Sequence, residues 1–227
     1  MKLQYWGHSC FLLETGTHAL LIDPFLSNNP KAPVSPSQVR CDFILVSHGH
    51  NDHFGDALEI ARRVNATIIA NYEIATYCEM QGARSHGMHI GGGHNFPFGR
   101  VKLTPAWHGS ALETDQGFLY MGNPAGFLIT AAGKTLYHAG DTGLFGDMKL
   151  IGDLQTIDVA LLPIGDNYTM GIDDAVKAVE FLHPRVAIPM HYNTFELIAC
   201  DPETFATKCR VSGTRAEVMQ VGGSFEF

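Results

Sequence analysis

The sequence predicts a layered α/β fold, in which two β-sheets pack face to face and helices cover both outer faces. In each half of the chain, a run of short apolar strands is followed by alternating strands and helices. The 227 residues, 45% hydrophobic and 17% charged, are enough to bury a sizeable core. We therefore expect residues 1–227 to form a single domain.

The first half should begin with an antiparallel meander. Short segments rich in apolar and aromatic residues at 2–6, 10–14 and 19–23 have the length of strands. The continuous apolar run of residues 42–46 predicts a strand that is buried on both faces. Two segments with helical apolar periodicity begin at an acidic residue and end near a basic residue or a glycine, which predicts helices over 56–64 and 73–81. A strand is predicted between them, over 67–70.

The second half repeats this order. Strands are predicted at 100–107, 118–121, 126–131 and 135–139. The alternation then resumes with strands at 158–163 and 186–190, helices at 172–182 and 202–210, and a closing strand at 218–221. In layered α/β folds, ligand sites gather in the loops beyond the C-terminal ends of strands, so candidate site residues should be sought there.

The charge balance argues against nucleic-acid and membrane partners. A net charge of −8 with scattered lysines and arginines leaves no basic stripe for phosphates, and no apolar run reaches the length of a membrane-spanning helix. We therefore expect a small-molecule substrate. Five widely spaced cysteines without a C-x-x-C pair, and an N-terminus without a secretory signal pattern, indicate a cytoplasmic location.

Twelve histidines are the compositional outlier, and three of them fall in the stretch Ser47–His53, SHGHNDH. This stretch follows a predicted strand, so we expect it to form a loop. Imidazole nitrogen and carboxylate oxygen bind zinc and similar divalent ions. His48 and His50 would point to one side of an extended backbone, whereas Asp52 and His53 diverge, which suggests two ions. The alternative is a solvated polar loop.

Further ligands should lie at the ends of predicted strands, next to small residues. His108 and His191 meet this criterion. His138 still lies within strand sequence, whereas Asp141 sits in the glycine-rich loop that follows, so we choose Asp141. Seven such groups buried without an ion would be desolvated and unpaired, which argues against the solvated loop.

The pattern H-x-H-x-D-H, followed by His108, Asp141 and His191, resembles the metallo-β-lactamase superfamily over essentially the whole chain. The resemblance implies a four-layered αββα sandwich that binds two metal ions. It also implies the ligand sets: His48, His50 and His108 for the first ion, Asp52, His53 and His191 for the second, and Asp141 between the two.

Four further segments make the resemblance narrower. Residues 5–9 (YWGHS), 21–24 (LIDP), 163–171 (PIGDNYTMG) and 188–192 (IPMHY) are similar to a small family of metal-dependent hydrolases. That family is related to ascorbate-phosphate lactonases and to phospholipase D-type members. The resemblance therefore implies a hydrolase.

Two divalent ions would lower the pKa of a shared water and polarise a carbonyl or phosphoryl oxygen. No G-x-S-x-G motif offers a serine nucleophile. We expect a metal-bridging hydroxide to cleave a small ester, lactone or phosphodiester, with Asp52, Asp166 or a metal-bound water supplying the proton of the leaving group. Zn²⁺ is the expected metal, and Mn²⁺, Ni²⁺ and Fe²⁺ are alternatives.

Other residues near the expected site have two interpretations. His8 and Asp23 either hold a metal ligand by a hydrogen bond or belong to turns. Tyr192 and Asn193 could donate to a substrate oxyanion, although packing within the loop is the favoured interpretation. Trp107, like Trp6, is expected in the core.

Three alternative functions stay open. A di-iron redox protein would carry an acidic residue in place of His50 and a flavin domain, for which 227 residues leave no room. A non-catalytic metal-binding module would hold metal without an exchangeable water. A nuclease of the same superfamily is disfavoured by the acidic balance. Homo-oligomerisation is compatible with each of these functions.

Overall fold

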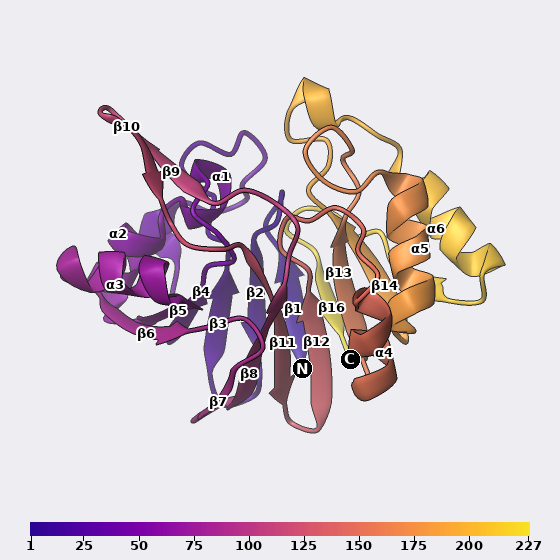
Figure 1. Cartoon of the computed structure of the whole chain (residues 1–227), viewed down its shortest axis with the longest axis horizontal. Helices are drawn as coiled ribbons and strands as arrows, with labels where there is room; N and C mark the ends of the chain where they lie inside the picture. Colours follow the sequence, from indigo (N-terminus) through magenta and orange to yellow (C-terminus); the bar gives the residue numbers. More distant parts are fainter.

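Two seven-stranded β-sheets lie against each other at the centre of the computed structural model, which describes residues 1–227 (Figure 1). The first sheet has the order β16-β1-β2-β3-β4-β5-β6. Its strands are β1 (Lys2–Tyr5), β2 (Phe11–Glu14), β3 (Ala19–Ile22), β4 (Phe43–Leu45), β5 (Thr67–Asn71), β6 (Arg84–Met88) and β16 (Ser224–Glu226). Pairing is antiparallel from β16 to β3 and parallel from β3 to β6.

The second sheet has the order β15-β14-β13-β12-β11-β8-β7, and a separate hairpin stands beside it. The strands of this sheet are β7 (Gly93–Phe96), β8 (Gly99–Pro105), β11 (Ala125–Ala131), β12 (Lys134–His138), β13 (Val159–Pro163), β14 (Val186–Met190) and β15 (Arg215–Ala216). Strands β9 (Ala111–Thr114) and β10 (Gly117–Tyr120) form the hairpin, which projects from one corner of the sandwich (Figure 1).

Helices cover the outer face of each sheet. Helices α2 (Ala57–Val64) and α3 (Tyr72–Met80) pack on the first sheet, whereas α4 (Met148–Leu154), α5 (Ile172–Leu182) and α6 (Pro202–Val211) lie on the side of the second (Figure 1). Two short 3₁₀ helices, Pro36–Gln38 and Glu196–Ile198, occur in loops. The predicted four-layered α/β sandwich is therefore confirmed. None of the helices combines the length and apolar character that a membrane span requires.

Apolar periodicity explains how the layers adhere. Between the sheets, large side chains such as Phe11, Phe127 and Tyr137 are fully buried. Helix α5 buries Ala175, Ala178, Val179 and Leu182, whose spacing of three or four residues gives one apolar face toward the sheet. Two firmly packed sheets form a rigid support for the loops at their edge.

Two predicted elements differ in the structure. The closing strand at 218–221 is wrong, because these residues connect β15, at the edge of the second sheet, to β16, at the edge of the first. The stretch Ser47–His53 is a loop only in its first part, since Asn51–Phe54 form the short helix α1. The amide groups of His53 and Phe54 donate to the carbonyl of His50 and start that helical turn.

Candidate metal centre

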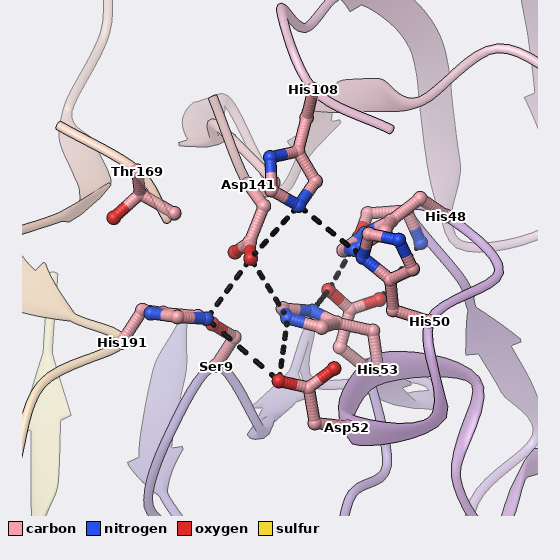
Figure 2. Close-up of polar contacts among 12 residues, drawn as sticks. Ser9, His48, His50, Asp52, His53, His108, Asp141, Thr169 and His191 are labelled. Atoms are coloured by element: carbon pink, nitrogen blue, oxygen red, sulfur yellow. Dashed lines mark hydrogen bonds and ion pairs between the residues drawn. The ribbon is translucent and has the colours of Figure 1, made fainter. Parts of the chain in front are cut away.

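The loops after several strands converge at one edge of the sandwich. The Ser47–His50 loop follows β4, His108 follows β8, Asp141 follows β12 and His191 follows β14 directly. Strands β12, β13 and β14 are parallel, as are β3 and β4, so their C-terminal ends meet at the same edge. Figure 2 shows the result, in which side chains from distant parts of the sequence point toward one another.

Three imidazoles form the first cluster. The Nε2 of His48 lies 3.0 Å from the Nδ1 of His50, and the Nε2 of His108 lies 3.3 Å from the same Nδ1. Burial lowers the pKa of all three imidazoles, so they are neutral near pH 7. Neutral rings can direct nitrogen lone pairs at a common cation.

A second cluster adjoins the first. The Oδ2 of Asp52 lies 4.0 Å from the Nε2 of His53 and 3.9 Å from the Nε2 of His191. The Oδ2 of Asp141 stands between the clusters, at 2.9 Å from the Nε2 of His191, 3.2 Å from that of His53 and 3.7 Å from that of His108 (Figure 2). One carboxylate therefore faces ligand nitrogens of both clusters.

The clusters fit divalent cations. The Oδ1 of Asp141 is buried and has no hydrogen-bond partner in the protein, and the buried Nε2 of His53 makes no well-aligned hydrogen bond, although it lies 3.2 Å from the Oδ2 of Asp141. Unpaired burial of polar atoms of this kind is costly, and a cation among the converging nitrogens and oxygens would compensate for it. A set of imidazoles and carboxylates without thiolate suits zinc, manganese, iron or nickel.

Charge coupling within the second cluster supports the same conclusion. Burial alone would lower the pKa of His53, but the carboxylates of Asp141 and Asp52 raise it well above its usual value. Burial would raise the pKa of Asp141 and of Asp52, but adjacent histidines lower both. In the metal-free protein, a proton on His53 thus offsets part of the negative charge of the two carboxylates. A divalent ion would take over this role when the proton leaves.

Asp23 and Ser47 set the orientation of two candidate ligands. The amide and hydroxyl of Ser47 donate to the carboxylate of Asp23 at 2.8 and 2.6 Å, and the Nδ1 of His53 donates to it at 2.8 Å. Because the hydroxyl proton of Ser47 is used in this way, its oxygen accepts from the Nδ1 of His48 at 2.9 Å. Both rings therefore turn Nε2 toward the clusters, and the Nε2 lone pair of His53 becomes available when its proton leaves.

His8 holds the carboxylate of Asp52. Its Nε2 lies 3.1 Å from the Oδ2 of Asp52, and its Nδ1 lies 2.9 Å from the Oγ1 of Thr194. Burial lowers the pKa of His8 to about 4, so the ring is neutral and donates one proton. The amide of His191 donates to the carbonyl of His8 at 2.8 Å, and both residues have a positive φ. This strained pair of loops is typical of a functional site.

Comparisons with known proteins identify the family of the chain. The model of the beta-lactamase superfamily domain matches residues 2–191. A UPF0173 metal-dependent hydrolase of Desulforamulus reducens is 55% identical over 224 residues, 98% of each chain, and one of Pelotomaculum thermopropionicum is 53% identical over 219 residues, 96% of this chain and 95% of the other. The chain belongs to the UPF0173 metal-dependent hydrolases of the beta-lactamase superfamily. Igni18, a metallo hydrolase of Ignicoccus hospitalis, has a similar structure, with a TM-score of 0.90, 40% identity, and coverage of 100% of this chain and 98% of the other.

Three residues predicted to act in catalysis or substrate binding by this UPF0173 hydrolase do not line the cavity at the metal clusters. Asp166 is exposed, packs beside Gly171 and lines a different cavity, a position that does not support a role in catalysis. Tyr192 and Asn193 line another separate cavity, and the Oδ1 of Asn193 accepts a hydrogen bond from the amide of Cys200 at 2.8 Å. Their placement supports loop packing.

Other residues at the metal cavity were not singled out from the sequence. Tyr168 and Phe195 line this cavity of about 360 Å³ together with candidate ligands. Tyr168 lies within the PIGDNYTMG segment, which was the available signal, whereas nothing marked Phe195. Ser47, directly before the first candidate ligand histidine, likewise carries no signal in the sequence for its contacts with Asp23 and His48. The prediction that Trp107 lies in the core is wrong, because its side chain is 72% exposed beside His108.

Proposed function

We propose that the chain is a dinuclear metal hydrolase that cleaves a small ester, lactone or phosphodiester by attack of solvent-derived hydroxide. The position of Asp141 is the observation that carries this proposal. A buried carboxylate oxygen within 2.9 to 3.7 Å of nitrogens from both clusters is what a pair of neighbouring cations requires.

The proposed ligand sets follow from the two clusters. His48, His50 and His108 would hold one ion, Asp52, His53 and His191 would hold the other, and Asp141 would contribute to both. When bound, the metal ions would lower the pKa of a coordinated water and polarise an oxygen of the substrate.

The protein itself contributes orientation and a place for the proton. Asp52 is 30% exposed toward the cavity, whereas the side chain of Asp141 is only 3% exposed. Because the Nε2 of His8 holds the Oδ2 of Asp52, the carboxylate keeps a fixed orientation in which it can take up and release a proton at the cavity. We therefore propose Asp52 as the proton-handling residue.

We further propose zinc as the resident metal, a cytoplasmic location and a single domain over residues 1–227. The nitrogen and oxygen donors support zinc. The five free cysteines, four of them buried, support a reducing compartment.

A panel of substrates before and after chelation tests the proposed hydrolysis. Protein loaded with Zn²⁺ or Mn²⁺ should hydrolyse at least one of a set of lactones, carboxylic esters, thioesters and bis-aryl phosphodiesters, and chelation should abolish turnover. His108→Gln should reduce the bound metal and lower kcat at least about 10- to 100-fold, since a lost ligand costs at least as much as a lost partner of a ligand.

His89→Gln changes an exposed histidine outside the clusters and should leave metal content and rate unchanged. A protein that binds metal but turns over no member of the panel would contradict the hydrolase proposal and support a non-catalytic metal-binding module.

A further inference from the structure

A second cavity opens directly beside the metal cavity. It has a volume of about 440 Å³ and shares His50, Asp52 and Phe195 with the metal cavity. A substrate whose reacting group lies at the metal clusters would therefore extend a neighbouring group into this space.

Aromatic side chains from three separate segments line the second cavity. Phe25 comes from the loop after β3, Phe118 from β10 and Phe195 from the loop after β14, and the rings of Phe25 and Phe195 lie 6.2 Å apart. Phe118 is 78% exposed and Phe195 is 41% exposed. Exposed apolar surface concentrated at the mouth of a site marks a ligand-binding surface.

The acidic side chains that line both cavities have no lysine or arginine beside them. The residues that line them include the carboxylates of Asp52, Asp141 and Glu113 but no lysine or arginine. A phosphate or carboxylate on the distal part of a substrate would find no cation of the protein there and would be repelled by Glu113. An uncharged apolar group meets neither difficulty.

The wall of the second cavity is anchored to the metal-binding segment. The amide of Glu113 donates to the Oδ1 of Asn51 at 3.2 Å, and the Nδ2 of Asn51 donates to the carbonyl of Glu113 at 3.4 Å. The amide of Gly49 donates to the hydroxyl of Ser110 at 3.1 Å, at the base of the same hairpin. These hydrogen bonds fix the position of the hairpin that carries Phe118 relative to α1 and to the residues around His50.

We propose that the second cavity binds an uncharged aryl or branched alkyl group of the substrate, so that the substrate is a neutral apolar ester or lactone rather than a phosphorylated sugar acid. This inference rests on the proposed function and specifies its substrate class. Phe118 and Phe195 supply the apolar contact, and Glu113 disfavours anionic groups.

Binding of hydroxamates to the Co²⁺-loaded protein tests the inference without turnover. Hydroxamates chelate metal ions, and the d–d spectrum of Co²⁺ reports their binding. Benzohydroxamate should bind about 10-fold or more tightly than acetohydroxamate, because its ring buries apolar surface in the second cavity. 4-Carboxybenzohydroxamate should lose most of this gain.

Variants identify the residues responsible. Phe118→Ala should reduce the preference for benzohydroxamate to about twofold or less, on the expectation that the lost ring contact supplied most of the gain. Leu119→Ala is the matched control, since Leu119 is adjacent on β10 but does not line the second cavity. Glu113→Gln should selectively strengthen binding of 4-carboxybenzohydroxamate, which a merely structural role would not do.

Equal affinities for acetohydroxamate and benzohydroxamate would overturn the inference. The inference would also be overturned if Phe118→Ala kept the wild-type preference for benzohydroxamate and lowered the oligomeric mass in sedimentation. Phe118 would then contact a second copy of the chain. Hydrolysis of esters without an aryl preference would contradict only this inference, whereas an aryl preference in binding without any hydrolysis would contradict only the proposed function.

Discussion

Replacing Asp23 by asparagine should weaken metal binding without direct contact to the metal. The carboxylate accepts three hydrogen bonds, from the amide and hydroxyl of Ser47 and from the Nδ1 of His53. An amide at this position has one oxygen and one NH₂ group, so at least one of these donors would face another donor. The simplest relief is a tautomer change of His53 that places a proton on Nε2, which points into the clusters.

The expected magnitude follows from this change. Loss of a partner that orients a metal-ligating histidine costs about 10- to 100-fold in affinity, or about 1.4 to 2.8 kcal/mol. Asp23→Asn should therefore show this loss at one of two sites when Zn²⁺ is titrated in competition with a chromophoric chelator. Circular dichroism checks that the variant is folded.

Asp56→Asn is a matched control. Asp56 also accepts hydrogen bonds in a loop, from the amides of Leu26 and Ser27, but touches no candidate ligand. It should lose stability and keep its Zn²⁺ affinity within about twofold, since no partner of a metal-ligating histidine is removed. Unchanged Zn²⁺ affinity in folded Asp23→Asn would refute the proposed orienting role.

Three further predictions address packing, metal and pH. Gly49→Ala should lower the free energy of unfolding by about 1 to 3 kcal/mol, because a Cβ at this position would overlap the side chain of Met121. Gly146→Ala is the control, since a Cβ there meets open space. Equal effects of the two variants in thermal unfolding would contradict the close packing of Gly49 against Met121. Chelation should lower Tm by roughly 5 to 10 °C if the metal is present at about 100 times its Kd, and a Tm unaffected by chelation would exclude a structural metal contribution. Buried imidazoles with lowered pKa bind protons more weakly in the folded than in the unfolded protein, so the metal-free protein should lose stability as the pH falls from about 6.5 toward about 4, the folded pKa of His8. His8 alone contributes at most about 3 kcal/mol across that window, and the raised pKa of His53 acts in the opposite direction. The imidazoles with lowered pKa are those of His8, His48, His50, His108 and His138. Denaturant titrations at pH 7 and 4.5 measure the net change in the free energy of unfolding. Equal or greater stability at pH 4.5 would contradict the prediction.

The layers and the family could be predicted from the sequence because buried strands and amphipathic helices leave strong patterns. The helix over 172–182 was predicted at its observed bounds. Strands β8, β12 and β14 run in the same direction within the second sheet, which explains why His108, Asp141 and His191 lie at one edge. Candidate ligands at strand ends are thus visible in the sequence, since strand order determines which loops meet.

Other features depend on contacts between distant segments. Strands β6, β7 and β9 are partly or wholly exposed and rich in polar residues or glycine, so they lack the alternation of a half-buried strand. The first residue of α1, Asn51, exchanges hydrogen bonds with Glu113, far along the chain. The hydroxyl of Ser47 gained its role only from the positions of Asp23 and His48.

Metal stoichiometry and position test the central claim most directly. Protein prepared with Zn²⁺ should contain two zinc ions per chain by elemental analysis. Anomalous diffraction at the zinc edge should place one ion among His48, His50 and His108 and the other among Asp52, His53 and His191, with Asp141 in contact with both. A single ion, or zinc bound elsewhere while these side chains turn away from one another, would contradict the account.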